Sequence, residues 1–263
     1  HRDLHSFPTR RSSDLAQVKA RLISNGSGIN LPGGTKSWRD VGFPFIFRVG
    51  TDEFLFGSLI DRLEEPKLAE GWLPVPEICY LHGTPFQSEG LVPLNQERKE
   101  QVQEIYRLEA FASTNPALSG NGVVFVSFDL KQGGKGYVAV DPGDSACIIF
   151  SNHILTSREG KVLAFFDHTW KFKNGLIRAE ITQTDKATLA IATKPFELNL
   201  APAFDADSYG KEREICIQTW KELIAKGTRI ETPDTLVNHA YRSSLCQIYR
   251  SEEHTSELQS RQS

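Results

Sequence analysis

The sequence predicts a mainly β protein: a large antiparallel β-sandwich, then a linker helix and the first helix of an α-helical domain. From Phe43 to about Leu200, short apolar runs of strand length alternate with turn-forming residues. Asn174-Gly175 joins two such runs in the manner of a tight hairpin. After about Ala206 the apolar spacing changes to that of a helix. Many strands with short turns, followed by helices, are typical of a sandwich with a helical extension.

Five strands are expected in the first half of the sandwich, because apolar and β-branched residues recur there between turns. They are Phe43–Val49, Phe54–Leu63, Val75–Leu81, Ile105–Thr114 and Val123–Leu130. The run Gly122–Leu130 is apolar on both of its faces, which favours a strand covered by packed layers on both sides.

The clearest local signal is a hairpin formed by Phe165–Lys173 and Leu176–Thr182. The intervening Asn174-Gly175 tolerates positive φ at both turn positions, as a type I′ turn requires. A further strand is expected at Ala187–Thr193, which would extend the same sheet pattern.

Two helices are expected after the strands. One carries apolar residues at helical spacing on a single face, namely Cys216, Ile217, Trp220, Leu223 and Ile224. Asp207 or Ser208 would cap its start, and Lys226-Gly227 suits its end. In the second, Thr232 is the expected N-cap and Pro233 the first helical residue.

The second helix has a wide apolar face with few partners left in the sequence. Its apolar residues are Leu236, Val237, Ala240, Tyr241, Leu245 and Ile248. We therefore expect an exposed apolar patch at Tyr241, Leu245 and Ile248, self-association of the chain, and a helical domain continuing beyond Tyr249.

Both ends of the sequence resemble translated sequencing adapters: His1–Leu15 and Arg250–Ser260. This resemblance implies four segments. They are an adapter-derived, disordered tail at 1–15, the sandwich at 16–205, the linker helix and the first helix of a truncated α/α toroid at 206–249, and a second adapter-derived tail at 250–263.

Composition excludes several classes of function. The formal net charge is −3 without a basic stripe, which argues against a nucleic-acid partner. No apolar run reaches the length of a membrane span, so no membrane contact is expected. The cysteines form no CxxC pair and the histidines no ligand spacing, so neither a metal nor a cofactor is expected. Buried free thiols are the expectation for Cys147 and Cys216.

Four stretches carry a resemblance to a known enzyme group. They are EGWLPVPEICY at Glu70–Tyr80, YRLEAFASTNPAL at Tyr106–Leu118, VVFVSFDL at Val123–Leu130, and the joint between sandwich and helices at Thr219–Leu245. The joint combines six residues, namely Trp220, Leu223, Gly227, Pro233, Asn238 and Arg242. The chain resembles bacterial glucoamylase-like glycoside hydrolases of the six-hairpin type, which join a β-supersandwich to an (α/α)6 toroid.

The resemblance implies that catalysis belongs to a domain other than the sandwich. In that group two carboxylates at the mouth of the toroid flank the glycosidic bond. No residue of this chain is therefore expected to be catalytic, and carbohydrate would be its partner only through the parent enzyme. A carbohydrate-binding or interaction sandwich without an enzymatic partner domain is the alternative.

Several residues are candidates for a binding role. Trp72 is the preferred sugar-stacking platform, ahead of Trp38 and Trp170, because it lies between a glycine and a Leu-Pro turn. The competing expectation for all of them is a packing role, as for Trp220. Two acidic sites were weighed as well: Glu109 is expected to be exposed or ion-paired on its strand, and Glu64-Glu65 to form a solvated turn.

Other motifs favour ordinary loops. The glycine-rich stretches 25–34 and 132–136 lack a Walker pattern. Asp129, Asp141 and Asp144 lack the order of a calcium loop. The pair Asp167-His168 has no nucleophile placed by motif, so no hydrolase triad is expected.

Overall fold

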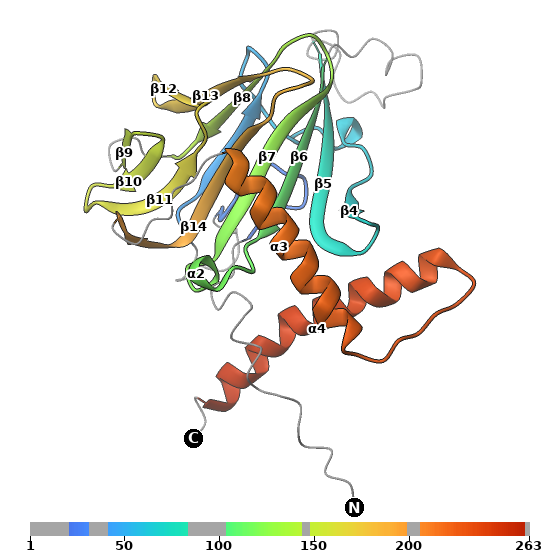
Figure 1. Ribbon diagram of the computed structural model, residues 1–263. Coiled ribbons are helices and arrows are strands. Elements are labelled where there is room, and N and C mark those ends of the chain that lie inside the picture. Colours follow the sequence, from blue (N-terminus) through green and yellow to red (C-terminus); the bar gives the residue numbers. More distant parts are fainter. Residues whose placement is uncertain (1–20, 32–41, 84–103, 144–147, 199–205, 261–263) are drawn as a thin grey trace, which may run out of the picture.

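A computed structural model describes residues 21–31, 42–83, 104–143, 148–198 and 206–260, with side chains of the last range described for 208–249. Two antiparallel sheets pack face to face, and helix α3 lies across the outer face of the larger sheet (Figure 1). Helix α4 crosses the end of α3 and lies beyond the sheets. The predicted class, an antiparallel sandwich followed by helices, is confirmed.

The smaller sheet has six strands, all paired antiparallel. In spatial order they are β1 (Gly28–Ile29), β2 (Phe45–Val49), β8 (Gly136–Asp141), β13 (Leu176–Ile181) and β12 (Lys171–Lys173), with β3 (Phe54–Leu55) paired to β2.

The larger sheet has eight strands, also antiparallel. Their order is β4 (Lys67–Ala69), β5 (Leu73–His82), β6 (Glu104–Ala112), β7 (Val123–Gln132), β14 (Ala187–Glu197), β11 (Lys161–Phe166), β10 (Ile154–Ser157) and β9 (Ile148–Ser151). A 3-10 helix η2 (Ile60–Arg62) and a single-turn helix α2 (Pro116–Ser119) lie in its connections.

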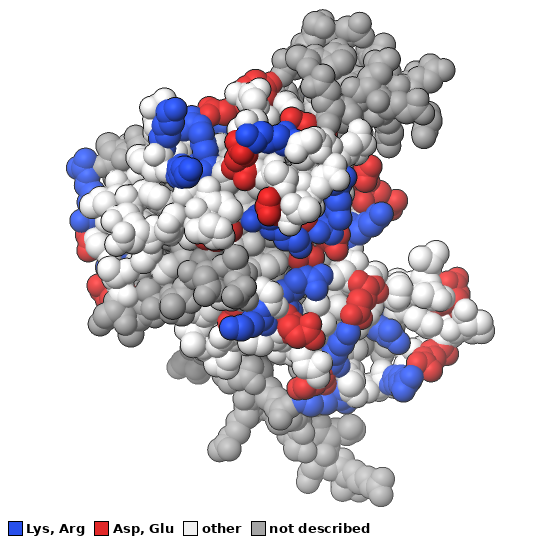
Figure 2. All heavy atoms as spheres, turned by 45° about the horizontal axis from the view of Figure 1, so that its top comes forward, with Lys and Arg blue, Asp and Glu red and all other residues white. Residues whose placement is uncertain are grey.

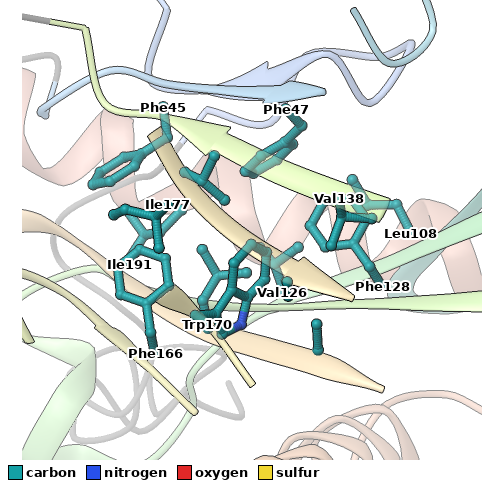
Figure 3. Packing of buried hydrophobic residues seen from close by; sticks show 14 of the residues in the cluster. Phe45, Phe47, Leu108, Val126, Phe128, Val138, Phe166, Trp170, Ile177 and Ile191 are labelled. Atoms are coloured by element: carbon teal, nitrogen blue, oxygen red, sulfur yellow. The ribbon is translucent and has the colours of Figure 1, made fainter. Parts of the chain in front are cut away.

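The main core lies between the two sheets (Figure 3). Phe47 of the smaller sheet meets Phe128 of the larger sheet edge to face, with ring centroids 5.2 Å apart. Trp170 is fully buried in this core, and its Nε1 donates a hydrogen bond to the Thr188 carbonyl oxygen at 2.9 Å. The indole is therefore satisfied inside the sandwich and unavailable to a ligand.

A second core lies on the opposite face of the larger sheet, under α3. Phe111 and Phe125 stack there with centroids 5.3 Å apart, and Tyr209 and Trp220 of α3 cover them. Strand β7 thus has an apolar layer on both sides, as its sequence predicts, and all of Val123–Leu130 is buried.

The hairpin turn is confirmed, but one of its strands is not continuous. Asn174 and Gly175 both have positive φ, 52° and 78°, between paired Lys173 and Leu176. The expected single strand Phe165–Lys173 is instead divided between β11 in one sheet and β12 in the other. The chain turns where the Asp167 carboxylate accepts the Thr169 N–H at 2.8 Å and Trp170 enters the core.

Helix α3 (Ala206–Ala225) buries the face that its spacing predicts: Cys216, Ile217 and Trp220 are buried against the sheet. Helix α4 (Thr235–Ser260) is capped by Asp234, whose Oδ1 accepts the Leu236 N–H at 2.8 Å. The prediction that Thr232 is the cap is therefore wrong, and Pro233 precedes the helix. Thr232 instead contacts the Asn238 side chain. The Asn238 Nδ2 donates a hydrogen bond to the Thr232 carbonyl oxygen at 2.9 Å.

Helix α4 continues past Tyr249, the expected boundary, without a break. It packs on the sandwich through one side, where Cys246 is buried. Of the predicted patch, Ile248 is exposed, as expected, whereas Tyr241 and Leu245 are half-buried. No helix in the described part of the chain is long and apolar enough to span a membrane.

Candidate functional site

A buried carboxylate attaches α3 to the larger sheet. Strand β6 directs Glu109 outward, and its side chain is only 4% exposed under the helix. Arg213 holds it with two hydrogen bonds, from Nε to Oε1 at 2.8 Å and from Nη2 to Oε2 at 2.9 Å. The Tyr209 hydroxyl donates to Oε1 at 2.7 Å and accepts from Ser127 Oγ at 2.9 Å. Both carboxylate oxygens are engaged by protein groups.

This arrangement keeps Glu109 ionised. Burial alone would raise the pKa of Glu109, but the hydrogen bonds from Arg213 and Tyr209 outweigh it and hold the pKa below its ordinary value. Burial and the nearby carboxylate raise the pKa of Tyr209, which therefore keeps its proton. A permanently ionised, fully bonded carboxylate serves attachment and is a poor proton donor.

A second polar contact fixes the same helix. Glu212 accepts hydrogen bonds from Ser113 Oγ at 3.2 Å and from Asn115 Nδ2 at 2.8 Å. The Thr114 hydroxyl donates to that of Thr219 at 3.2 Å. Because these contacts join the residues that follow β6 to Glu212 and Thr219, about two turns apart on α3, the helix has one defined position on the sheet.

Helix α4 sits on the turn between β4 and β5. Gly71 has a φ of +77°, and a Cβ at this position would lie 2.3 Å from His239 Nδ1. The guanidinium of Arg242 lies over the Trp72 ring, 5.7 Å from its centroid. Only glycine therefore permits both this turn and this close approach.

The larger sheet also carries two adjoining hollows on this outer side, of about 310 Å³ and 220 Å³. Together they form what we name the charged trough. Its carboxylates are Glu64, Glu65, Glu77 and Asp129. Its cations are Lys67, Arg107, Lys131 and Lys186. Figure 2 shows that acidic and basic side chains are intermixed on the face in view and not gathered into patches of one sign.

Arg107 organises the trough. Its Nε donates to both oxygens of Asp129, at 3.1 and 2.9 Å, its Nη2 also pairs with Asp129, and its Nη1 donates to Glu77 at 3.3 Å. Burial would lower the pKa of Arg107, but Asp129 and Glu77 raise it above its usual range. Cys79, Arg107 and Asp129 lie side by side on β5, β6 and β7, so the strand register sets this geometry.

Cys79 lines the trough but is no nucleophile. Burial raises the pKa of its thiol, and the charge of Glu64 raises it further. The thiolate, which is the reactive form, is therefore disfavoured at neutral pH. Burial likewise raises the pKa of Cys216 to about 12, in agreement with the expected buried free thiol. Cys147 lies outside the described residues.

Trp72 does not have the exposure that a sugar-stacking platform needs. Its side chain is 6% exposed and packs in the second core under Arg242. Trp220 is buried as the packing residue that the sequence predicts, and Trp38 lies outside the described residues. The sequence alone could not show that Trp72 is a packing residue, because the helices that cover it follow it by more than 130 residues.

The remaining motifs form no site in the described part of the chain. Asp167 accepts hydrogen bonds from Thr169 and Thr188, while His168 is exposed, so the two make no relay pair. Asp141 accepts from the Gly143 N–H and pairs with Arg48. No cluster of three or more His, Cys, Asp or Glu that could hold a metal occurs among the residues described.

Sequence reasoning weighed Glu64-Glu65 and Glu109 but did not find the trough. Its signal is Asp129 at the end of a strand that is otherwise apolar on both faces, together with Arg107 two residues before Glu109. Only the register of β5, β6 and β7 brings these residues together. No protein-family model, curated protein or solved structure matches the chain.

Proposed function

We propose that the chain is a non-catalytic sandwich of a carbohydrate-processing enzyme of the glucoamylase-like type, and that its two helices carry an α-helical catalytic domain. The observation that carries this proposal is the exposed apolar side of α4. Val237 and Ile248, about three turns apart on one side of the helix, are 50% and 48% exposed, whereas the helix packs on the sandwich through Cys246 on the opposite side. Large apolar side chains repeated along one helix suit the packing of further helices.

The four stretches that carry the family resemblance support the proposal, because they contact one another. Glu70 of the first stretch pairs with Lys221 of the joint at 2.6 Å. The Thr114 hydroxyl of the second stretch donates a hydrogen bond to that of Thr219 in the joint at 3.2 Å. Strands β6 and β7 place the second and third stretches side by side. Residues of these stretches thus join sandwich and helices, which is the task expected of a supporting domain.

The described carboxylates also suit a supporting role. Glu109, Glu77 and Asp129 are each held by an arginine on a rigid strand or helix. A glycosidase needs one carboxyl that exchanges a proton and a second one across the bond. We propose that such a pair belongs to the α-helical catalytic domain.

Two measurements test the proposal. The chain alone, incubated with α- and β-linked oligosaccharides, should release no sugar in a chromatographic assay. The parent reading frame should encode repeated helix pairs with acidic residues in paired loops. Hydrolysis by the chain itself, or a parent frame without such helices, would overturn the assignment.

A carbohydrate-binding module without an enzymatic partner is the second candidate. The charged trough favours this candidate, because the trough is a polar hollow on the sandwich and needs no second domain to form. The two candidates separate on whether a helical catalytic domain accompanies the sandwich in the parent protein.

A further inference from the structure

We propose that the charged trough binds a small, neutral, hydroxyl-rich ligand, a saccharide of one or two units. This inference goes beyond the proposed function, since it assigns to the sandwich a binding site of its own. Its basis is the trough's charge balance, its rigid frame and its size.

The balance of charges in the trough selects against ions. Four carboxylates face four cations, so the trough has no net charge to attract a free anion or cation. A hydroxyl group both donates and accepts hydrogen bonds, and alternating carboxylates and ammonium groups satisfy both of its functions. A neutral polyol is thus the ligand that can donate hydrogen bonds to the carboxylates of the trough and accept them from its cations.

The polar groups are held in place before any ligand arrives. Arg107 of β6 donates hydrogen bonds to Asp129 of β7 and Glu77 of β5, which fixes these two carboxylates on the strands that flank β6. A carboxylate has about four lone-pair positions, and Glu77, which is partly exposed and lines the larger hollow, retains acceptor capacity beside its one bond to Arg107. Lys131 lines both hollows and supplies a donor to each. Fixed groups of this kind reduce the entropy cost of binding.

The size of the trough limits the ligand. Small-molecule sites span roughly 300–1,000 Å³, and the larger hollow, of about 310 Å³, lies at the lower end of this range. The hollow of about 220 Å³ adjoins it through Arg107 and Lys131, which offers space for a second small unit. Ile105 and Cys79 give the larger hollow a minor apolar part, against which the carbon face of a sugar ring can rest.

Stability alone gives little reason for this network. Glu77 and Lys186 are partly or largely exposed, and exposed ion pairs contribute only about 0–1 kcal/mol. Such a concentration of paired charges in one hollow, on the same outer face of the larger sheet that α3 covers farther along, is better explained by recognition.

The test is a titration of the full chain, followed by two-dimensional ¹H–¹⁵N NMR, with glucose, maltose or cellobiose. Inorganic phosphate and glycine are the anionic and zwitterionic comparison probes. We expect saturable shifts in β5, β6 and β7 with at least one saccharide and weaker binding of both comparison probes. Glu77→Gln, which removes a charged acceptor and keeps the shape, should weaken saccharide binding about tenfold.

Lys131→Ala alters an exposed side chain and serves as a second variant should Glu77→Gln fail to fold. The matched control is Glu180→Gln, a half-exposed glutamate paired with Lys135 on the smaller sheet, which should leave binding unchanged. Three results would overturn the proposal: no saccharide shifts the NMR signals, the trough variants bind saccharide as tightly as the native chain, or phosphate or glycine binds more tightly than the saccharides. Each of these results leaves the docking of a helical domain on α4 intact, so the two proposals fail separately.

Discussion

At the scale of single residues, the strongest determinant of how sandwich and helices fit together is Glu109. The sequence predicts an exposed or ion-paired residue at this position, and the ion pair is what the structure shows. Its partner Arg213 lies 104 residues away, so no local pattern could identify it. Trp72 shows the same limit, because its covering residue Arg242 comes from the last helix.

Replacing Glu109 by Gln should destabilise the protein by about 2–3 kcal/mol, because Arg213 would lose its charged partner in a partly buried site. Urea denaturation, monitored by tryptophan fluorescence, measures this loss. Glu180→Gln on the exposed pair with Lys135 is the control and should change the free energy of unfolding far less. Equal losses of unfolding free energy in both variants would show that the buried pair stabilises the protein no more than the exposed pair does.

The same carboxylate should make stability depend on acid. The pKa of Glu109 is lower in the folded protein than the value of about 4.3 for a free glutamate side chain. Its contribution is therefore complete above that unfolded value and is lost as the pH falls through the folded pKa. Unfolding free energies measured from pH 6 down to pH 3 should fall more steeply for the native chain than for Glu109→Gln. Parallel profiles would contradict this assignment.

At the scale of elements, local patterns predict most strand and helix positions, because periodicity and turn chemistry act over a few residues. The expected strand Phe54–Leu63 is wrong for most of its length: only Phe54–Leu55 is a strand, and Ile60–Arg62 is a 3-10 helix. The Asn174-Gly175 turn and the buried face of α3 were predictable from such local patterns. The division of Phe165–Lys173 between two sheets was not, since the sheet that a strand joins depends on distant partners. The trough escaped prediction on the same ground, because strand register alone assembles it.

The start of α4 gives a prediction for this scale. Asp234→Ala should destabilise the first turn of α4 by about 1 kcal/mol, because the Leu236 N–H would lose its acceptor. Hydrogen exchange of the amides that follow Asp234 measures the effect, which should be absent in α3. Asp234→Asn retains a capping oxygen and is the matched control. Should Thr232→Ala alone release the helix start, the capping role would belong to Thr232 after all.

At the scale of the whole molecule, the described part of the chain has two apolar cores and, on α4, an exposed apolar side. The cores lie on both faces of the larger sheet and are closed by the smaller sheet and by α3. One side of α4 remains open to solvent at Val237 and Ile248, and Leu236 is exposed in the first turn of the helix. Isolated exposed apolar residues are normal on protein surfaces, whereas several on one helix promote association.

The chain should therefore self-associate through α4. Sedimentation velocity across a range of protein concentrations should show oligomers, and Val237→Glu combined with Ile248→Glu should shift the protein towards monomer. Both side chains are exposed, so the thermal unfolding midpoint of the sandwich should stay within about 2 °C of the native value. The control is Ile149→Glu, an exposed apolar residue of β9, which should leave association unchanged. A native chain that stays monomeric at high concentration would show that this side of α4 needs no cover, and the proposed docking of a helical domain would lose its physical basis.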